Sequence, residues 1–380
     1  MWQPWSATQR CAGGMIGDAV RALTKDEIKV MDKILRDALN QGAMGLSMGL
    51  IYAHEVNSSL EELKSMVNAL KPSNKYLSVH LRSEAGHILE ALDEVLGLAG
   101  EAGVPVKISH LKIRGKKNWH LFENVLNKLE AALHQGIKVS FDVYPYDTSW
   151  SVLYTYLPKW AYEGGRKQIV EAIKDPVSRR KILDHLRQAG DALESIVVAG
   201  ALGNNNFTGK TLRQIAQNQN VSAEEAVLNV IAATNAQVTV FDHNLSAEQM
   251  ERLCFSPLSL IATDGAGYSE KNSSLNHPRC YGTFPKFLSM VREKKVLKWE
   301  QAIQKLTSEP AKLMGISDRG SFAKNSKADI VIFDPLTLAD NADYKNPDLF
   351  SDGIDMVVVN GKLGFGRKLA LNLYGQVIRR

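Results

Sequence analysis

From about residue 24 onward, short strand-like runs alternate with amphipathic helices, and this alternation most constrains the fold. It is typical of βα units, in which helices pack onto a parallel sheet and connect its strands. The sequence predicts an α/β protein with a (β/α)8 TIM-type barrel, incomplete at its N-terminal strands. The predicted helices lie at 58–71, 86–102 and 119–135, and the predicted strands at 43–47, 76–80, 104–109, 137–143, 195–200, 237–241 and 258–263.

The helix that opens this series has a clear start signal. Thr24 and Glu27 have the spacing of a capping box, in which each side chain bonds a free backbone amide of the other residue. Gly42 is expected to end the helix. Its predicted apolar face consists of Ile28, Met31, Ile34, Leu35 and Ala38.

The last 65 or so residues have a different pattern. Lys327–Asp334 is a β run stopped by Pro335, and Ile354–Lys362 is a second run that contains a hairpin-type Asn360-Gly361 turn. We expect a barrel over 1–315 and a small C-terminal β appendage over 316–380.

Composition excludes several classes of protein. The net charge of +5 is small for 380 residues, and basic clusters such as 114–117 are isolated, so we expect solvated surfaces and no nucleic-acid partner. No apolar run approaches the roughly 20 residues of a membrane helix, and the N-terminus does not resemble a signal peptide. Three cysteines far apart predict no disulfide framework and favour a reducing, cytoplasmic location.

Three of the predicted strands end in side chains that can bind a metal or move a proton. His80 and His110 are one βα unit apart, and Asp264 follows the strand 258–263. In a parallel barrel, catalytic groups lie at the C-terminal ends of several strands. A lone histidine is usually structural, but two imidazoles and a later carboxylate suit a divalent metal, an activated water and a base.

Other residues near these strand ends could bind a substrate. Arg279 offers a planar fork for a carboxylate, Lys112 adds a positive charge, and Tyr144 ends a strand with a phenolic donor. The alternative is an ordinary loop salt bridge for the charged residues and a packed aromatic for Tyr144. His277 could line the site, and a structural turn is equally consistent with its neighbours.

Together these segments resemble the N-acyl-D-amino-acid deacylases, or D-aminoacylases, of the amidohydrolase superfamily. The resemblance rests on segments in the family's order, with Met48 where threonine is usual: 42–52, 78–84, 104–112 with Gly115 and 118–119, 142–146, 263–265 and 277–285. The closing segment, 320–361, is similar to the superfamily's C-terminal β strands, which implies that the appendage over 316–380 belongs to a small sandwich domain. The resemblance implies that His80 and His110 are zinc ligands and that Asp264 acts as base and then acid. It also implies that Lys112, Tyr144 and Arg279 hold the carboxylate and carbonyl of a small-molecule N-acyl amino acid.

The sequence departs from the family in its metal ligands. Members carry a His-x-His strand and a metal-binding cysteine upstream, and Cys11 lies too close to the later motifs to be that cysteine. We therefore expect at most a partial zinc site and weak or no turnover from this chain. Three interpretations stay open: an N-acyl-D-amino-acid deacylase, an inactive or weakly active truncated remnant, and an amidohydrolase for another linear or cyclic amide.

Overall fold

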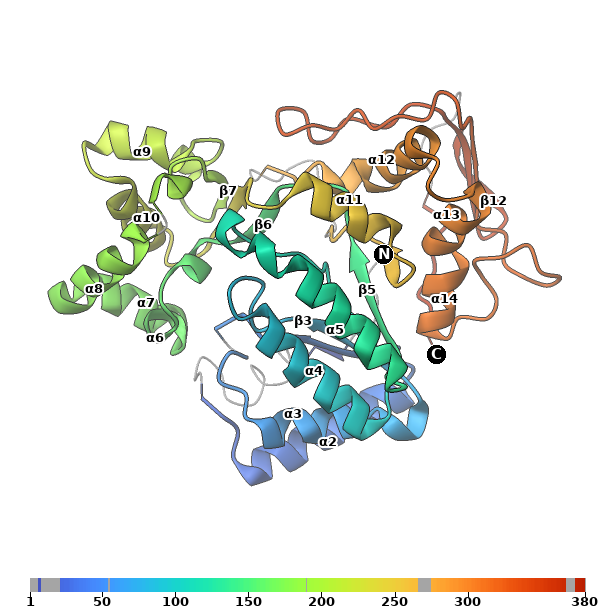
Figure 1. Ribbon diagram of the computed structural model, residues 1–380, viewed down its shortest axis with the longest axis horizontal. Coiled ribbons are helices and arrows are strands. Elements are labelled where there is room, and N and C mark those ends of the chain that lie inside the picture. The colour runs from blue at the N-terminus through green and yellow to red at the C-terminus, as the bar shows by residue number, and fades with distance from the viewer. Residues whose placement is uncertain are drawn as a thin grey trace.

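The computed structural model describes residues 6–7, 21–53, 55–188, 190–265, 275–366 and 373–379. Its central feature is a six-stranded sheet in which every pair of neighbours is parallel (Figure 1). The strands follow the order β1 (Ser6–Ala7), β2 (Gly45–Gly49), β3 (Tyr76–His80), β4 (Val106–Ile108), β5 (Val139–Val143) and β9 (Ser259–Ile261). The α/β class and the parallel sheet predicted from the sequence are confirmed.

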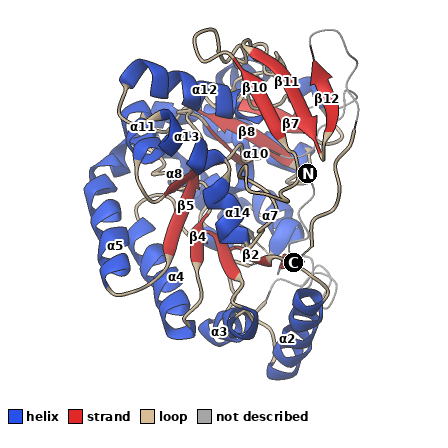
Figure 2. Cartoon of the chain, turned by 90° about the vertical axis from the view of Figure 1, so that its right-hand side faces the viewer, coloured by secondary structure: helices blue, strands red, loops and turns tan. Residues whose placement is uncertain are grey.

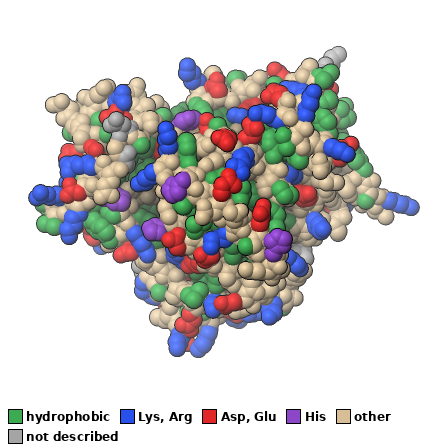
Figure 3. Space-filling view, viewed as in Figure 1, with side chains coloured by type: hydrophobic (Ala, Val, Ile, Leu, Met, Phe, Trp, Pro, Cys, Tyr) green, Lys and Arg blue, Asp and Glu red, His purple; other side chains and the backbone are tan. Residues whose placement is uncertain are grey.

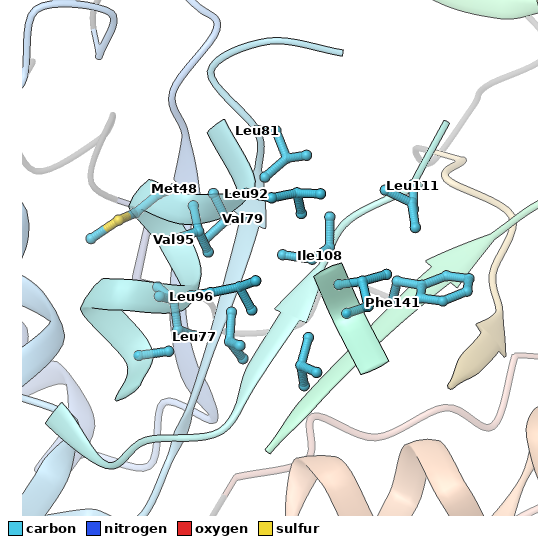
Figure 4. Packing of buried hydrophobic residues seen from close by; sticks show 14 of the residues in the cluster. Met48, Leu77, Val79, Leu81, Leu92, Val95, Leu96, Ile108, Leu111 and Phe141 are labelled. Atoms are coloured by element: carbon cyan, nitrogen blue, oxygen red, sulfur yellow. The ribbon is translucent and has the colours of Figure 1, made fainter. Parts of the chain in front are cut away.

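One face of this sheet is apolar and is covered by helices. Leu77, Val79, Ile108 and Phe141 are fully buried there, in one cluster with Leu92, Val95 and Leu96 of the helix that follows β3 (Figure 4). Fully burying one such side chain stabilises the fold by about 1.5–3 kcal/mol. This layer includes α2 (Lys25–Asn40), α3 (Leu60–Asn68), α4 (Ile88–Ala102), α5 (Phe122–His134) and α11 (Ala247–Phe255).

The opposite face of the same strands is polar. Side chains alternate between the two faces of a strand, so the residues between the apolar positions point the other way. These residues are Ser47, Ser78, His80, Lys107, Ser140 and Asp142. The functional side chains at the strand ends therefore belong to a polar interior and not to the helix-covered core.

The start of α2 confirms the predicted capping box. The Thr24 hydroxyl accepts from the Glu27 amide, and the Glu27 carboxylate accepts from the Thr24 amide. The predicted apolar face is right at Ile28, Met31 and Leu35 but wrong at Ile34, which is 38% exposed. Leu39 is buried on that face instead, because the helix presents a narrower stripe to the core.

The predicted strands 195–200 and 237–241 form, but they do not join the parallel sheet. They are β7 (Val197–Ala201) and β8 (Val238–Asp242), and β8 lies between β6 (Ser149–Val152) and β7 in an antiparallel sheet. Five of the seven predicted strands thus build the parallel sheet. The correction has a physical cause: β6, which sequence reasoning missed, gives β8 an antiparallel partner.

Five helices accompany this second sheet and form the green group in Figure 1. They share a separate apolar cluster that includes Leu153, Ile182 and Val240. The helices are α6 (Lys159–Tyr162), α7 (Gly165–Lys174), α8 (Pro176–Arg187), α9 (Leu212–Gln219) and α10 (Ala223–Ala233). Among the described residues, the 3-10 helices are η1 (Lys71–Ser73), η2 (Lys116–Leu121), η3 (Leu153–Tyr156), η4 (Gly190–Leu193) and η5 (Asn205–Phe207).

The C-terminal part contains helices and a third sheet, seen at the top of Figure 2. Strands β10 (Ile330–Phe333), β11 (Ile354–Val359) and β12 (Lys362–Gly366) are antiparallel neighbours, which confirms a small C-terminal β unit. The predicted hairpin turn has positive φ at Asn360 (51°) and Gly361 (77°). The preceding helices are α12 (Arg279–Lys294), α13 (Trp299–Leu306) and α14 (Ser308–Met314), and the domain boundary at 315/316 stays a prediction.

Two observations concern the molecular surface. On the face shown in Figure 3, basic and acidic side chains are interspersed. Within the described ranges, every helix is too short or too polar to cross a membrane.

Candidate active site

The two strand-end histidines lie side by side. His80 is the last residue of β3, and His110 lies two residues beyond β4, which pairs with β3 in parallel register. Their ring centroids are 4.3 Å apart in an edge-to-face arrangement. Adjacent parallel strands therefore bring together the two residues that the sequence predicts as zinc ligands.

A third potential ligand, Glu84, joins them. Its Oε1 atom lies 3.3 Å from Nε2 of His80 and 3.2 Å from Nδ1 of His110. The ligand atoms of all three residues lie within 4.8 Å of one another. Sequence reasoning gave Glu84 no role, although its position four residues after His80, in the same loop, was an available signal.

Glu84 is also the ion-pair partner of Lys112. The Lys112 Nζ lies 2.5 Å from Glu84 Oε1 and 2.8 Å from His110 Nδ1. The side chains of Lys112 and Glu84 are both buried. Burial raises the pKa of Glu84, but Lys112 and His80 outweigh it and hold that pKa well below its usual range. Burial lowers the pKa of Lys112, and Glu84 opposes this change. The carboxylate is therefore ionised at neutral pH.

The donor set fits zinc. Two imidazoles and one carboxylate are the protein ligands of many catalytic zinc sites, and bonds near 2 Å in a tetrahedral site place ligand atoms about 3.3 Å apart. The distances from Glu84 Oε1 to His80 Nε2 and to His110 Nδ1, 3.3 and 3.2 Å, match that spacing. In addition, Nε2 of His80 is buried and has no hydrogen-bond partner among the described residues. His80, His110 and Glu84 are thus the residues that would hold the ion.

The surroundings of His80 keep its imidazole neutral. Burial lowers its pKa to about 4, against the opposing effect of Glu84. The Tyr52 hydroxyl lies 3.3 Å from Nδ1, on the side of the ring away from Glu84. A neutral imidazole with one nitrogen fixed by a neighbour is the form that binds metal. Tyr52 is a further site residue that sequence reasoning did not single out.

Asp264 and Arg279 form the second half of the site. Arg279 Nη2 lies 2.8 Å from Asp264 Oδ2 and donates to the Asp264 carbonyl oxygen at 3.0 Å. Burial raises the pKa of Asp264, but Arg279, and then His110, Lys112 and His80, bring it below its ordinary value. Asp264 lies just beyond β9 and His110 just beyond β4, and these two parallel strands flank β5, so the two halves of the site lie at one edge of the sheet. The Asp264 side chain remains 36% exposed and so is accessible to water.

Backbone strain coincides with these strand ends. His110 and Asp264 have φ of 39° and 46°, in the left-handed region that most residues other than glycine avoid. Such a conformation costs about 1–3 kcal/mol and persists only where the surrounding structure enforces it. Both strained residues are ones that the sequence predicts to be functional.

Tyr144 lies beside Arg279. The guanidinium carbon is 4.4 Å from the Tyr144 ring centroid and 5.6 Å from that of Trp150. The Tyr144 hydroxyl is buried and makes no hydrogen bond within the part of the chain that the structure describes. An unpaired buried hydroxyl is costly, so a donor is available here for a bound molecule.

His277 has a structural position. Its Nδ1 accepts from the Arg279 backbone amide at 3.0 Å, and its Nε2 lies 3.0 Å from the Thr148 carbonyl oxygen. Burial and Arg279 lower its pKa well below the usual value, so the ring is neutral. Of the two roles that the sequence left open for His277, the structural turn is the one observed, and it orients the start of α12.

Known proteins resemble this chain in sequence and in fold. The sequence pattern of the amidohydrolase family matches residues 14–365. An N-acyl-D-glutamate deacylase of Alcaligenes xylosoxydans xylosoxydans is 27% identical over 93% of this chain and 64% of its own length. A D-aminoacylase of the same organism is 29% identical over 90% of this chain and 63% of its own length. The chain thus spans a little less than two thirds of these relatives.

Solved structures agree. An N-acyl-D-glutamate deacylase from Bordetella bronchiseptica superposes with a TM-score of 0.80 at 27% identity, covering 96% of this chain and 69% of that one. That crystal structure contains zinc and a phosphonate inhibitor that mimics the tetrahedral intermediate of its reaction. A D-aminoacylase structure gives the same TM-score and identity, covering 98% of this chain and 70% of that one. The TIM-type architecture predicted from the sequence is thereby confirmed.

Proposed function

This chain belongs to the amidohydrolase family, and we propose that it supports the zinc-dependent hydrolysis of N-acyl-D-amino acids to a carboxylate and a D-amino acid. The observation that carries the proposal is that the His80, Glu84 and His110 donors and the Asp264–Arg279 pair follow strands of one parallel sheet at the same edge. A set of metal donors, a carboxylate base and a cation for the substrate's own carboxylate suits hydrolysis of an amide beside a free carboxyl group.

Each residue of the site has a chemical task. Asp264 is ionised, so it can take a proton from the attacking water and deliver it to the departing amine. Without that proton, the amine would be a very poor leaving group. Tyr144 offers its hydroxyl to the acyl carbonyl oxygen, where negative charge develops. Zinc held by His80, Glu84 and His110 would polarise that carbonyl and lower the pKa of water toward 7.

The positive side chains orient the substrate. Arg279 has a planar fork that can bind a carboxylate through two hydrogen bonds, and Lys112 adds a second charge next to the histidines. A carboxylate held on one side of the scissile carbonyl fixes where the substituents of the α-carbon can lie. This geometry is the basis on which we infer selection of one enantiomer.

Partner and location form part of the proposal. The substrate is a small N-acyl amino acid, and neither nucleic acid nor a membrane is a partner. We infer a cytoplasmic location, which the buried thiol of Cys254 supports.

A substrate panel tests the proposal. The zinc-loaded chain would be incubated with N-acetyl-D- and N-acetyl-L-amino acids and with a cyclic amide such as a hydantoin, and product amine would be quantified. We expect release from the D-compounds at rates at least about tenfold above their L-enantiomers. Faster hydrolysis of the cyclic amide would instead identify another amidohydrolase, and absence of hydrolysis in the whole panel would contradict the proposal.

A further inference from the structure

The backbone of His110 is held by a side chain on the neighbouring strand. Asp142 is on β5, and its Oδ1 accepts a hydrogen bond from the His110 amide at 2.5 Å. The next amide, that of Leu111, donates to the Asp142 carbonyl oxygen at 2.9 Å. One residue of β5 therefore fixes two successive amides at the strained position that carries the imidazole.

The Asp142 carboxylate is itself oriented by Lys107. The Lys107 Nζ contacts Asp142 Oδ2, the oxygen that is not used by His110. Both side chains are largely buried on the polar face of the sheet, with 14% and 10% exposed. Because each carboxylate oxygen has its own partner, the carboxylate plane cannot rotate without breaking one contact.

The other side of the same turn is fastened to β3. The Ser109 amide donates to the Val79 carbonyl oxygen at 2.8 Å, and the Ser109 and Ser78 hydroxyls lie 2.8 Å apart. Strand β3 thus holds residue 109, and β5 holds residues 110 and 111. A non-glycine residue at φ 39° needs such enforcement, since the relaxed backbone would leave this conformation.

We propose that Asp142, oriented by Lys107, is the positioning residue that points the His110 imidazole at His80 and Glu84. The inference rests on the proposed function, because it concerns the geometry of the zinc donors. Removing a group that orients a metal ligand typically lowers metal affinity by about 10- to 100-fold. Here the orientation acts through the main chain of the ligand instead of through its second ring nitrogen.

Two double variants separate position from charge. In K107M/D142N and in K107M/D142A the buried ion pair is replaced by neutral groups, so the local net charge equals that of the wild-type pair. Only the asparagine variant keeps an oxygen that can accept from the His110 amide. A difference in zinc affinity between them therefore reports the hydrogen bond and not electrostatic attraction.

A variant in the other sheet controls for lost stability. Asp242 ends β8, is buried to nearly the same degree as Asp142, and accepts from Tyr156 at 2.5 Å and from Asn244 at 2.7 Å. Asp242→Ala removes a comparable buried carboxylate without contacting the zinc donors. Far-UV circular dichroism and thermal unfolding would accompany all variants, so that zinc affinities are compared among folded proteins.

The experiment is a chelator-competition titration with zinc, together with the visible spectrum of the cobalt-loaded protein. We expect K107M/D142N to bind zinc within about threefold of wild type. We expect K107M/D142A to bind about 10- to 100-fold more weakly with an altered cobalt spectrum, and D242A to bind as wild type does.

Three results would count against these expectations. Equal zinc affinities of the two double variants would overturn the positioning role of Asp142 but would leave the proposed function intact. An equal loss in D242A would overturn it too, by showing that general destabilisation weakens binding. A wild-type chain that binds no zinc would contradict the proposed function, and the inference would fall with it.

Discussion

Arg279 and Asp264 are paired, with Nη2 of the arginine 2.8 Å from Oδ2 of the aspartate. The pairing couples the group proposed to move protons to the group proposed to bind the substrate carboxylate. It favours the ionised form of Asp264, and it limits the directions in which the guanidinium can meet a substrate. Changes at the two residues should therefore have different kinetic consequences.

Asp264→Asn should remove the proton-transfer step. We expect kcat to fall by about 10²- to 10⁴-fold, the usual contribution of a positioned general acid–base. The zinc content should be nearly unchanged, because His80, Glu84 and His110 remain. Steady-state kinetics and metal analysis of the same preparation would check this, with exposed Asp93→Asn as the control. Retained turnover would mean that another residue is the base.

Arg279→Met should weaken binding of substrates that carry a free carboxylate. Hydrogen bonds to charged groups are worth about 1.5–3 kcal/mol, so KM should rise by about 10- to 100-fold. Arg252→Met is a suitable control, because this arginine pairs with Glu123 at the surface. The kinetics would be compared for an N-acyl amino acid and its methyl ester. An equal loss for the ester would show that Arg279 acts on something other than the carboxylate.

Glu84→Gln tests the ligand that the sequence did not reveal. The substitution leaves Lys112 buried without its anionic partner and removes one zinc donor. We expect zinc affinity to fall by at least about tenfold, measured by chelator competition. Glu94→Gln, which affects the ion pair with Arg82, should leave affinity unchanged. Wild-type affinity in Glu84→Gln would exclude this carboxylate from the metal site.

Buried neutral histidines should make the metal-free protein sensitive to mild acid. Burial lowers the pKa of His80 to about 4 and that of His277 well below its usual value. An ordinary histidine has a pKa of about 6.5. Above that pH, these rings are neutral in both the native and the unfolded protein. Below it, the unfolded chain binds protons that the native protein does not bind, so the free energy of unfolding falls. The slope is up to about 1.4 kcal/mol per pH unit for each histidine.

Urea unfolding of chelator-treated protein at pH 7, 6 and 5 measures this effect. His277→Gln should be less stable at pH 7 but should show a shallower decline, because one titrating ring is gone. Exposed His87→Gln should keep the wild-type slope. A wild-type stability that does not change between pH 7 and 5 would contradict the assignment of neutral buried rings.

Local sequence patterns predicted the strand ends and the residues on them. Parallel βα units place successive strand ends at one edge of a sheet, which is why His80 and His110 could be paired from their spacing alone. The capping box at Thr24 and the turn at Asn360 were predictable for a different reason: the interacting groups are only a few residues apart in the sequence.

What the sequence did not reveal depends on contacts between distant segments. Strands β7 and β8 were expected in the barrel, yet β8 pairs with β6, which lies about 90 positions earlier in the chain. The Glu84–Lys112 pair and the Asp142–His110 hydrogen bond join different loops and strands. Sequence spacing carries no information about such pairs, because they form only when the sheet is assembled.

The expectation of weak turnover rested on two visible zinc donors, and the structure adds Glu84 as a third candidate. The most direct test is therefore to titrate zinc into chelator-treated protein while D-amino acid release from an N-acetyl-D-amino acid is followed. The account predicts that release rises with zinc, saturates, and is absent in His110→Ala at the same zinc concentration. A release rate that is independent of zinc, or unchanged in His110→Ala, would contradict the account.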